Sequence, residues 1–237
     1  MLASPAMPEP VDPLDRLYAY AAWMLGDRVA ALATLRDVVG RMPGAGFSAH
    51  FAELRRVVLA EAARHKGAPA RERERLDDTL RLGTSISMKL GPTGLRSDLR
   101  RLPVLLTGFM QSCLIAVVQT LSPTQRDAFV LLFVFGLSEA EVVALHGMSP
   151  HTFSSVKARL LVGVEGYLGP RCGHLDARNP CQCPSRLQLA LDQAFVQLPA
   201  HESPGEAYPA GVFSELRDLF AAVPPLRLAP EVRASLA

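Results

Sequence analysis

The sequence predicts an all-α protein made of two small helical domains, a linker between them and a helical C-terminal extension. Ala, Leu, Val and Arg dominate while aromatic residues make up only 6% of the chain, a composition that favours helices over sheets. Neither the alternation typical of strands nor an internal repeat stands out. With 237 residues, 49% of them hydrophobic, the chain can bury two small cores.

Residues 12–66 are expected to form the first domain, a unit of three helices. Asp12-Pro13 is a helix start and Gly26 is a helix end. The segment 43–46, Pro-Gly-Ala-Gly, separates the next two helices. The predicted helices are 13–25, 28–42 and 47–65.

Two segments are expected to stay outside the cores. Residues 1–11 lack the basic start and apolar stretch of a signal peptide, which predicts a disordered lead-in and a cytoplasmic chain. Residues 67–101 are rich in Gly, Pro and charge, which suits a linker.

The uncharged residues 102–125 are long enough to be tested as a membrane span. Polar residues interrupt them, so we expect a buried helix and no membrane span, with a membrane role as the alternative.

Residues 102–169 are predicted to form the second domain, which carries a helix-turn-helix. Ser122-Pro123 opens one helix and Gly136 ends it. Ser138 and Glu141 have the spacing of a capping box, which predicts a short second helix as far as His146-Gly147. Ser149-Pro150 repeats the start signal.

The third helix of this domain is predicted to carry the DNA contacts. Its apolar residues recur at three- and four-residue steps, so its opposite face is free. Side chains on that face can donate hydrogen bonds to bases or phosphates in a major groove. The net charge of +2 gives no broad basic field, so DNA binding has to be local. The alternative is a protein-binding module of three helices. The predicted DNA-binding residues are His151, Thr152, Ser154, Ser155, Lys157 and Arg159.

Three motifs in this domain resemble region 4 of sigma-70 family sigma factors. They are L-S-P-x-Q-R-D at 121–127, G-L-S-x-x-E at 136–141 and G-M-S-P-x-T at 147–152. Residues 14–66, with a Gly-Asp-Arg turn at 26–28, resemble region 2. Together the two stretches are similar to an extracytoplasmic-function (ECF) sigma factor with a divergent region 2.

The resemblance implies core RNA polymerase, promoter DNA and an anti-sigma or other regulatory protein as partners. Region 4 contacts the −35 promoter element in that family, and a helix in region 2 docks on the polymerase. That helix is usually acidic, whereas Val29, Ala30, Leu32 and Ala33 replace most of its charge here. Two usual basic positions of the recognition helix are Ser and Val in this chain, which predicts weaker DNA binding. The polymerase-binding residues carried over are Asp27, Arg28, Arg36 and Asp37.

The extension, residues 170–237, begins with a Cys/His cluster. Cys172, His174, Cys181 and Cys183 are soft or borderline ligands that suit one structural Zn²⁺. Redox sensing and an inert turn with reduced thiols are the alternatives. Amphipathic helices are expected at 185–198, within 211–223 and at 230–236.

The sequence leaves two functions open. The first is a sigma factor that directs core polymerase to promoters. The second is a degenerate sigma-like regulator that acts through contacts with polymerase or with a sigma or anti-sigma partner, without melting the promoter. An enzyme is not expected, because neither a phosphate-binding Gly-rich loop nor a His-Glu-x-x-His motif occurs.

Overall fold

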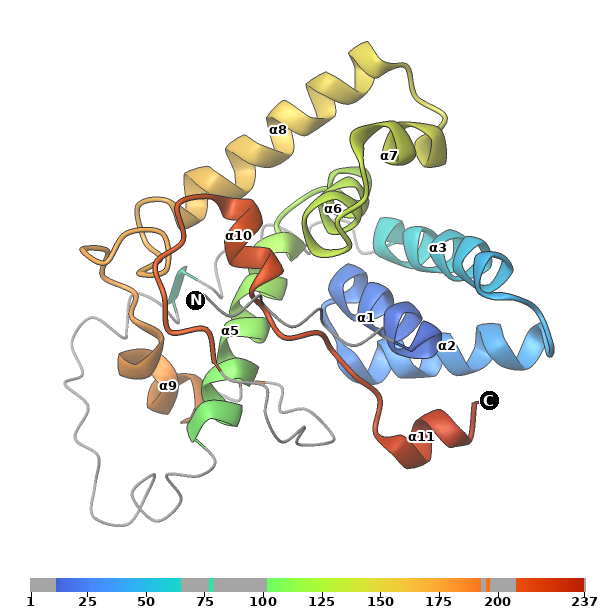
Figure 1. Cartoon of the computed structure of the whole chain (residues 1–237), viewed down its shortest axis with the longest axis horizontal. Coiled ribbons are helices and arrows are strands. Elements are labelled where there is room, and N and C mark those ends of the chain that lie inside the picture. The colour runs from blue at the N-terminus through green and yellow to red at the C-terminus, as the bar shows by residue number, and fades with distance from the viewer. Residues whose placement is uncertain (1–11, 65–76, 79–101, 193–194, 197–207, 237) are drawn as a thin grey trace, which may run out of the picture.

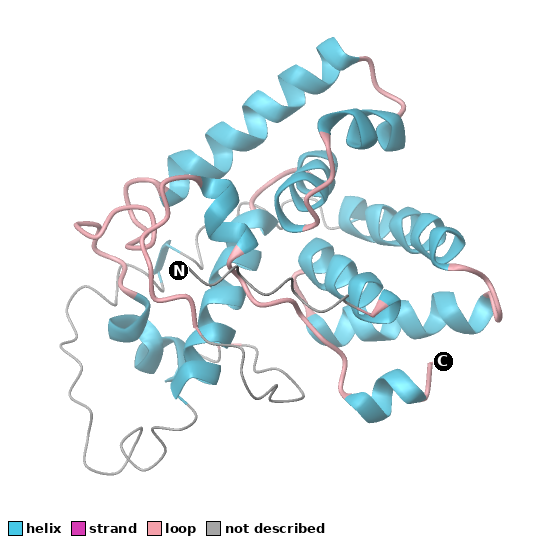
Figure 2. Ribbon diagram, viewed as in Figure 1, coloured by secondary structure: helices cyan, strands magenta, loops and turns pink. Residues whose placement is uncertain are grey.

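The computed structural model describes residues 12–64, 77–78, 102–192, 195–196 and 208–236. These residues form helices joined by loops, with a single isolated bridge between Cys172 and Cys181 in place of a sheet (Figure 2). The all-α prediction is confirmed. The predicted lead-in and most of the predicted linker lie outside the described residues. The helices are α1 (Pro13–Leu25), α2 (Arg28–Arg41), α3 (Phe47–Arg64), α5 (Leu102–Gln119), α6 (Pro123–Phe129), η2 (Val130–Val134), α7 (Glu139–His146), α8 (Pro150–Leu168), α9 (Cys183–Asp192), α10 (Leu216–Ala221) and α11 (Pro230–Ala234).

The helices α1, α2 and α3 pack on one another as the sequence predicted. α1 starts at the Asp12 carboxylate, which accepts from the amide of Leu14 at 2.8 Å. It ends at Gly26, whose φ of 73° is left-handed. A Cβ at Gly26 would lie 2.8 Å from the side chain of Gln119. Glycine is therefore needed there both for the backbone conformation and for the close approach of α5.

The helix α5 forms the centre of the structure. By length and composition alone it could cross a membrane, but 67% of it is buried inside the protein. It contacts α1, α6, α8 and α9, and its apolar residues supply much of the core. Burial on all sides explains why the helix is apolar around its whole circumference.

The helix that was predicted to run from Ser122-Pro123 to Gly136 differs from the prediction. It is α-helical only from Pro123 to Phe129 and then widens into the π-helix η2. The amide of Phe135 donates to the carbonyl of Val130 at 3.0 Å, a spacing of five residues. This turn brings Phe133 into a stack with Phe129, with ring centroids 4.6 Å apart.

The two predicted domains are in direct contact. In Figure 1 the blue helices α1 to α3 lie beside the green helices α5 and α6, and α3 packs against α6 while α1 packs against α5, α6 and η2. The helical core is therefore continuous across both units.

The C-terminal extension covers both units. α9 packs on α5 and α10 packs on η2, and the ring of Phe220 in α10 lies 5.7 Å from Trp23 and 4.8 Å from Phe129. The chain then runs past α1 to α11 (Figure 1), where Arg233 lies 2.8 Å from the buried carboxylate of Asp15. The helix expected at 185–198 ends at Asp192, so Phe195 packs against Phe109 from a non-helical segment.

Candidate nucleic-acid interface

Local capping positions the two helices of the helix-turn-helix. The Ser138 hydroxyl accepts from the amide of Glu141 at 3.3 Å, and Glu141 accepts from the amide of Ser138 at 2.8 Å, which completes the predicted capping box. Gly147 ends α7 with a φ of 61°. Ser149 then caps α8 by accepting from the amide of Thr152 at 3.1 Å. The turn between α7 and α8 is thus fixed by residues that the sequence identifies.

The recognition helix α8 buries one face and leaves the other in solvent. Phe153, Leu160 and Val164 are fully buried against α6 and α7. Five of the six predicted DNA-binding residues are exposed, and the described part of the extension does not bury them. The sixth, Lys157, forms an ion pair with Glu139 of α7. The exposed five are His151, Thr152, Ser154, Ser155 and Arg159.

Arg126 of the Q-R-D motif is buried and connects α6 to the ends of α1 and α5. Its guanidinium donates to the carbonyl of Met24 at 2.6 Å and to that of Gln119 at 2.9 Å, the C-terminal ends of α1 and α5. A cation is favourable at this end of a helix because the last carbonyls lack partners within the helix. The motif was expected from the family pattern, but its structural role was not predicted from the sequence.

Asp127, the next residue, is the centre of a buried polar cluster between the two units. Its carboxylate accepts from Arg55 of α3 at 2.6 and 2.8 Å and from the Tyr20 hydroxyl of α1 at 2.7 Å. His146 of α7 lies 3.2 Å away. Burial alone raises the pKa of Asp127, but the contacts from His146, Arg55 and Tyr20 outweigh it and lower the pKa. The carboxylate is therefore ionised at neutral pH.

Three of the four predicted polymerase-binding residues, Asp27, Arg36 and Asp37, are exposed, and the fourth, Arg28, is partly buried. Asp27 caps α2 by accepting from the amides of Val29 and Ala30. Arg28 turns inward and donates to Gln111 of α5 at 2.8 Å; burial lowers its pKa. Arg36 and Asp37 are exposed, and Asp37 pairs with Arg41 at 2.8 Å. The exposed side of α2 also carries an apolar residue, Val29, which is 80% exposed.

The predicted metal ligands meet beside α5 and are joined there by Cys113, which was not among the predicted ligands. Cys172, Cys181, Cys183, His174 and Cys113 line one small cavity. All four cysteines are free thiols. Within the described ranges, no three or more His, Cys, Asp or Glu side chains already stand in an arrangement that could hold a metal ion.

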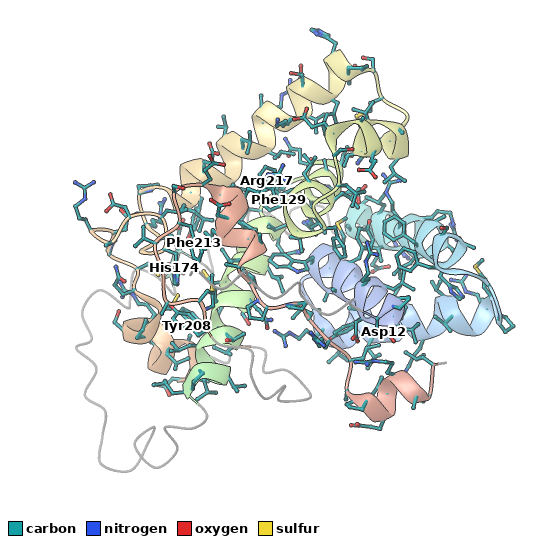
Figure 3. All side chains as sticks on the ribbon, viewed as in Figure 1. Asp12, Phe129, His174, Tyr208, Phe213 and Arg217 are labelled. Carbon is teal, nitrogen blue, oxygen red and sulfur yellow. The ribbon has the colours of Figure 1, made fainter. Side chains whose placement is uncertain are left out.

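The imidazole of His174 is held by protein groups on both sides. Its Nδ1 lies 2.8 Å from the carbonyl of Gly211, and its Nε2 lies 2.7 Å from the hydroxyl of Tyr208. Figure 3 shows His174, Tyr208 and Phe213 on the same side of the molecule. The Sγ atom of Cys183 is 3.5 Å from Nε2. Since the carbonyl can only accept, Nδ1 carries a proton and donates to it.

The thiols of this cluster are poor nucleophiles. Burial raises the pKa of Cys181 to about 11 and that of Cys183 to about 12. Because only the thiolate reacts readily with oxidants, this environment disfavours redox sensing by these two residues.

One comparison with known proteins identifies part of the chain. Residues 111–160 match the family model of Sigma-70, region 4. Neither the curated proteins nor the solved structures contain a significant match. The matched residues run from the middle of α5 to Leu160 of α8 and so include α7, the turn and the first part of α8. Residues 111–160 are therefore similar to sigma-70 region 4, the DNA-binding helix-turn-helix domain of sigma factors.

Proposed function

We propose that the chain is a cytoplasmic, non-enzymatic transcription initiation protein of the ECF sigma type, which binds core RNA polymerase and directs it to promoter DNA. The observation that carries this proposal is the exposed polar face of α8 within the residues that match sigma-70 region 4. Its hydroxyl, imidazole and guanidinium groups are donors suited to base edges and phosphates.

The face of α8 is suited to modest rather than tight DNA binding. Arg159 is exposed, whereas Lys157 is partly neutralised by Glu139. Phosphate contacts from Lys and Arg supply much of the affinity of DNA-binding proteins. Stable promoter binding would then depend on attachment to polymerase through the N-terminal unit, where Asp27, Arg36 and Asp37 are the exposed charged candidates.

The alternative function is a sigma-like regulator that binds polymerase, or a sigma or anti-sigma partner, without melting promoter DNA. The closed contact between the two units favours it. In the family that the chain resembles, region 4 contacts the −35 element and region 2 is associated with melting at the −10 element, so the two regions act on separate parts of the promoter. Direct ion pairing of Arg55 with Asp127 at 2.6 Å holds the two units together. Initiation would require this contact to open.

Co-elution of the full chain with core RNA polymerase at moderate salt, with a known sigma factor as competitor, tests the proposal. Displacement by the competitor, followed by transcripts from a defined promoter with core enzyme alone, supports a sigma factor. Binding that the competitor does not displace supports the regulator. If the chain does not bind polymerase at all, it can be neither a sigma factor nor a regulator that acts on polymerase.

A single substitution in α8 tests DNA binding separately from polymerase binding. Arg159→Ala, on the exposed face of α8, should weaken promoter binding while leaving polymerase binding unchanged, because the residue is remote from the N-terminal unit in the sequence and exposed in the fold. Equal loss of both activities would indicate misfolding or a different interface.

A further inference from the structure

All four cysteines of the chain gather at one cavity. Cys113 comes from α5, Cys172 and Cys181 come from the loop after α8, and Cys183 is the first residue of α9. The cavity has a volume of about 20 Å³, enough for one particle the size of a water molecule. Convergence of every thiol from three separate segments on a space of that size points to a single bound ion.

The loop that carries two of these thiols is tightly built. The Cys172 and Cys181 segments pair through backbone hydrogen bonds of 2.9 and 3.0 Å. The Asn179 side chain donates to the carbonyls of Gly169 and Cys172 at 2.7 and 2.9 Å. A Cβ at Gly173 would lie 2.4 Å from the side chain of Gln182. The backbone around the thiols is therefore fixed before any ion binds.

Cys113 is a better fourth ligand than His174. Both ring nitrogens of His174 already have protein partners, Gly211 and Tyr208. The Cys113 thiol, by contrast, lines the same cavity as the other three thiols. Met110, Leu114 and Leu219 also line the cavity and would keep water out.

We propose that Cys113, Cys172, Cys181 and Cys183 form a structural Zn²⁺ site, with His174 as a neighbour that braces the loop. Four thiolates satisfy the tetrahedral preference of zinc, and a set of four protein ligands is typical of a structural rather than a catalytic site. On binding, each thiol releases its proton to solvent and the sulfur donates to the ion. Among the described residues these side chains do not yet stand in a metal-holding arrangement, so zinc binding requires the thiols to change rotamer.

This site would tie the extension to the region 4 domain. Cys113 lies inside the matched residues 111–160, whereas the other three ligands lie in the extension. Zinc would therefore fix α9 and the loop before it on α5. The inference does not depend on DNA or polymerase binding, so its failure would leave the proposed function untouched.

The test is anaerobic zinc binding by the full chain in the presence of a competing chelator, with Cys113→Ser and His174→Gln as matched variants. The wild type should bind about one zinc per chain. Cys113→Ser should weaken binding at least about tenfold, since even outer-shell changes cost that much, while His174→Gln should weaken it less. Absence of competitive zinc binding by the wild type overturns the site, and a greater loss from His174→Gln than from Cys113→Ser overturns the ligand set.

Cobalt substitution of the wild type keeps the ligand set testable even where Cys113→Ser fails to fold. Tetrahedral Co²⁺ with four thiolates gives a sulfur-to-metal charge-transfer band whose intensity grows with the number of thiolates. An intensity typical of four sulfurs supports the inclusion of Cys113. An intensity typical of three, with one nitrogen ligand, assigns the fourth position to His174 and contradicts the proposal.

Discussion

Substitution of Asp127 by Asn should destabilise the whole protein, because Asp127 is the shared partner of three helices. The change keeps the shape of the side chain but removes its charge. Arg55, whose side chain is only 17% exposed, would then be left without its counter-ion. Tyr20, which donates to the carboxylate at 2.7 Å, would lose a charged acceptor.

The expected cost follows from the burial of the pair. Removal of one partner from a buried ion pair costs about 3–5 kcal/mol. Since Arg55 retains some exposure, we expect the lower end, about 3 kcal/mol in the free energy of unfolding. For a chain of this size each kcal/mol lowers Tm by about 2–4 °C, so Tm should fall by about 6–12 °C.

Urea and thermal unfolding followed by circular dichroism measure this effect. Glu139→Gln is the matched control, because it removes the carboxylate of the partly exposed pair with Lys157 and should cost less than about 1 kcal/mol. A double-mutant cycle of Asp127→Asn with Arg55→Met isolates the pair. A coupling energy below about 0.5 kcal/mol, within the error of additivity, would refute the assignment of Asp127 as the centre of the contact.

Further substitutions and a pH titration test other parts of the structure. Gly26→Ala should cost at least about 1–2 kcal/mol because of its left-handed backbone, whereas Gly40→Ala, which meets nothing within 4 Å inside α2, should be neutral or stabilising by about 0.5–1 kcal/mol; equal effects on Tm would contradict this. Phe220→Ala should cost about 3–5 kcal/mol and speed proteolysis of the extension, and an unchanged digestion pattern would show that α10 does not hold it. The pKa of Asp127 is lowered on folding, so its contribution to stability is present above an unfolded pKa of about 3.9 and is lost as the pH falls through the lower folded value; Asp127→Asn should flatten this acid limb, and parallel limbs would contradict it. Arg159→Ala should reduce the slope of log K against log salt by about 1, measured by fluorescence anisotropy on promoter DNA.

The sequence was sufficient for features with local causes. The capping box of Ser138 with Glu141 and the cap at Ser149 each involve residues three positions apart. The same local rules predicted the ends of α1 and α7 at glycines. The exposed face of α8 followed from the period of its apolar residues, because burial of one helical face leaves the other free.

Contacts between residues far apart in the sequence could not be predicted from local patterns. Arg55 and Asp127 are 72 positions apart, and no local pattern in either segment indicates that they meet. Cys113 lies in an apolar helix far from the Cys/His cluster, so spacing gave no reason to join it to that cluster. The π-helical turn at Val130–Val134 lies within a continuous apolar run, where periodicity cannot separate one helix type from another.

The contact of Asp15 with the far end of the chain affects how the protein is made. Its buried carboxylate accepts from the amide of Leu228 at 2.8 Å and lies 2.8 Å from Arg233. Leu228 is synthesised 213 positions later, which takes roughly 10–40 s at 5–20 residues per second. During that interval the Asp15 carboxylate lacks these partners, so it has to stay in contact with water. These contacts of α1 are therefore completed only after Leu228 and Arg233 have been synthesised.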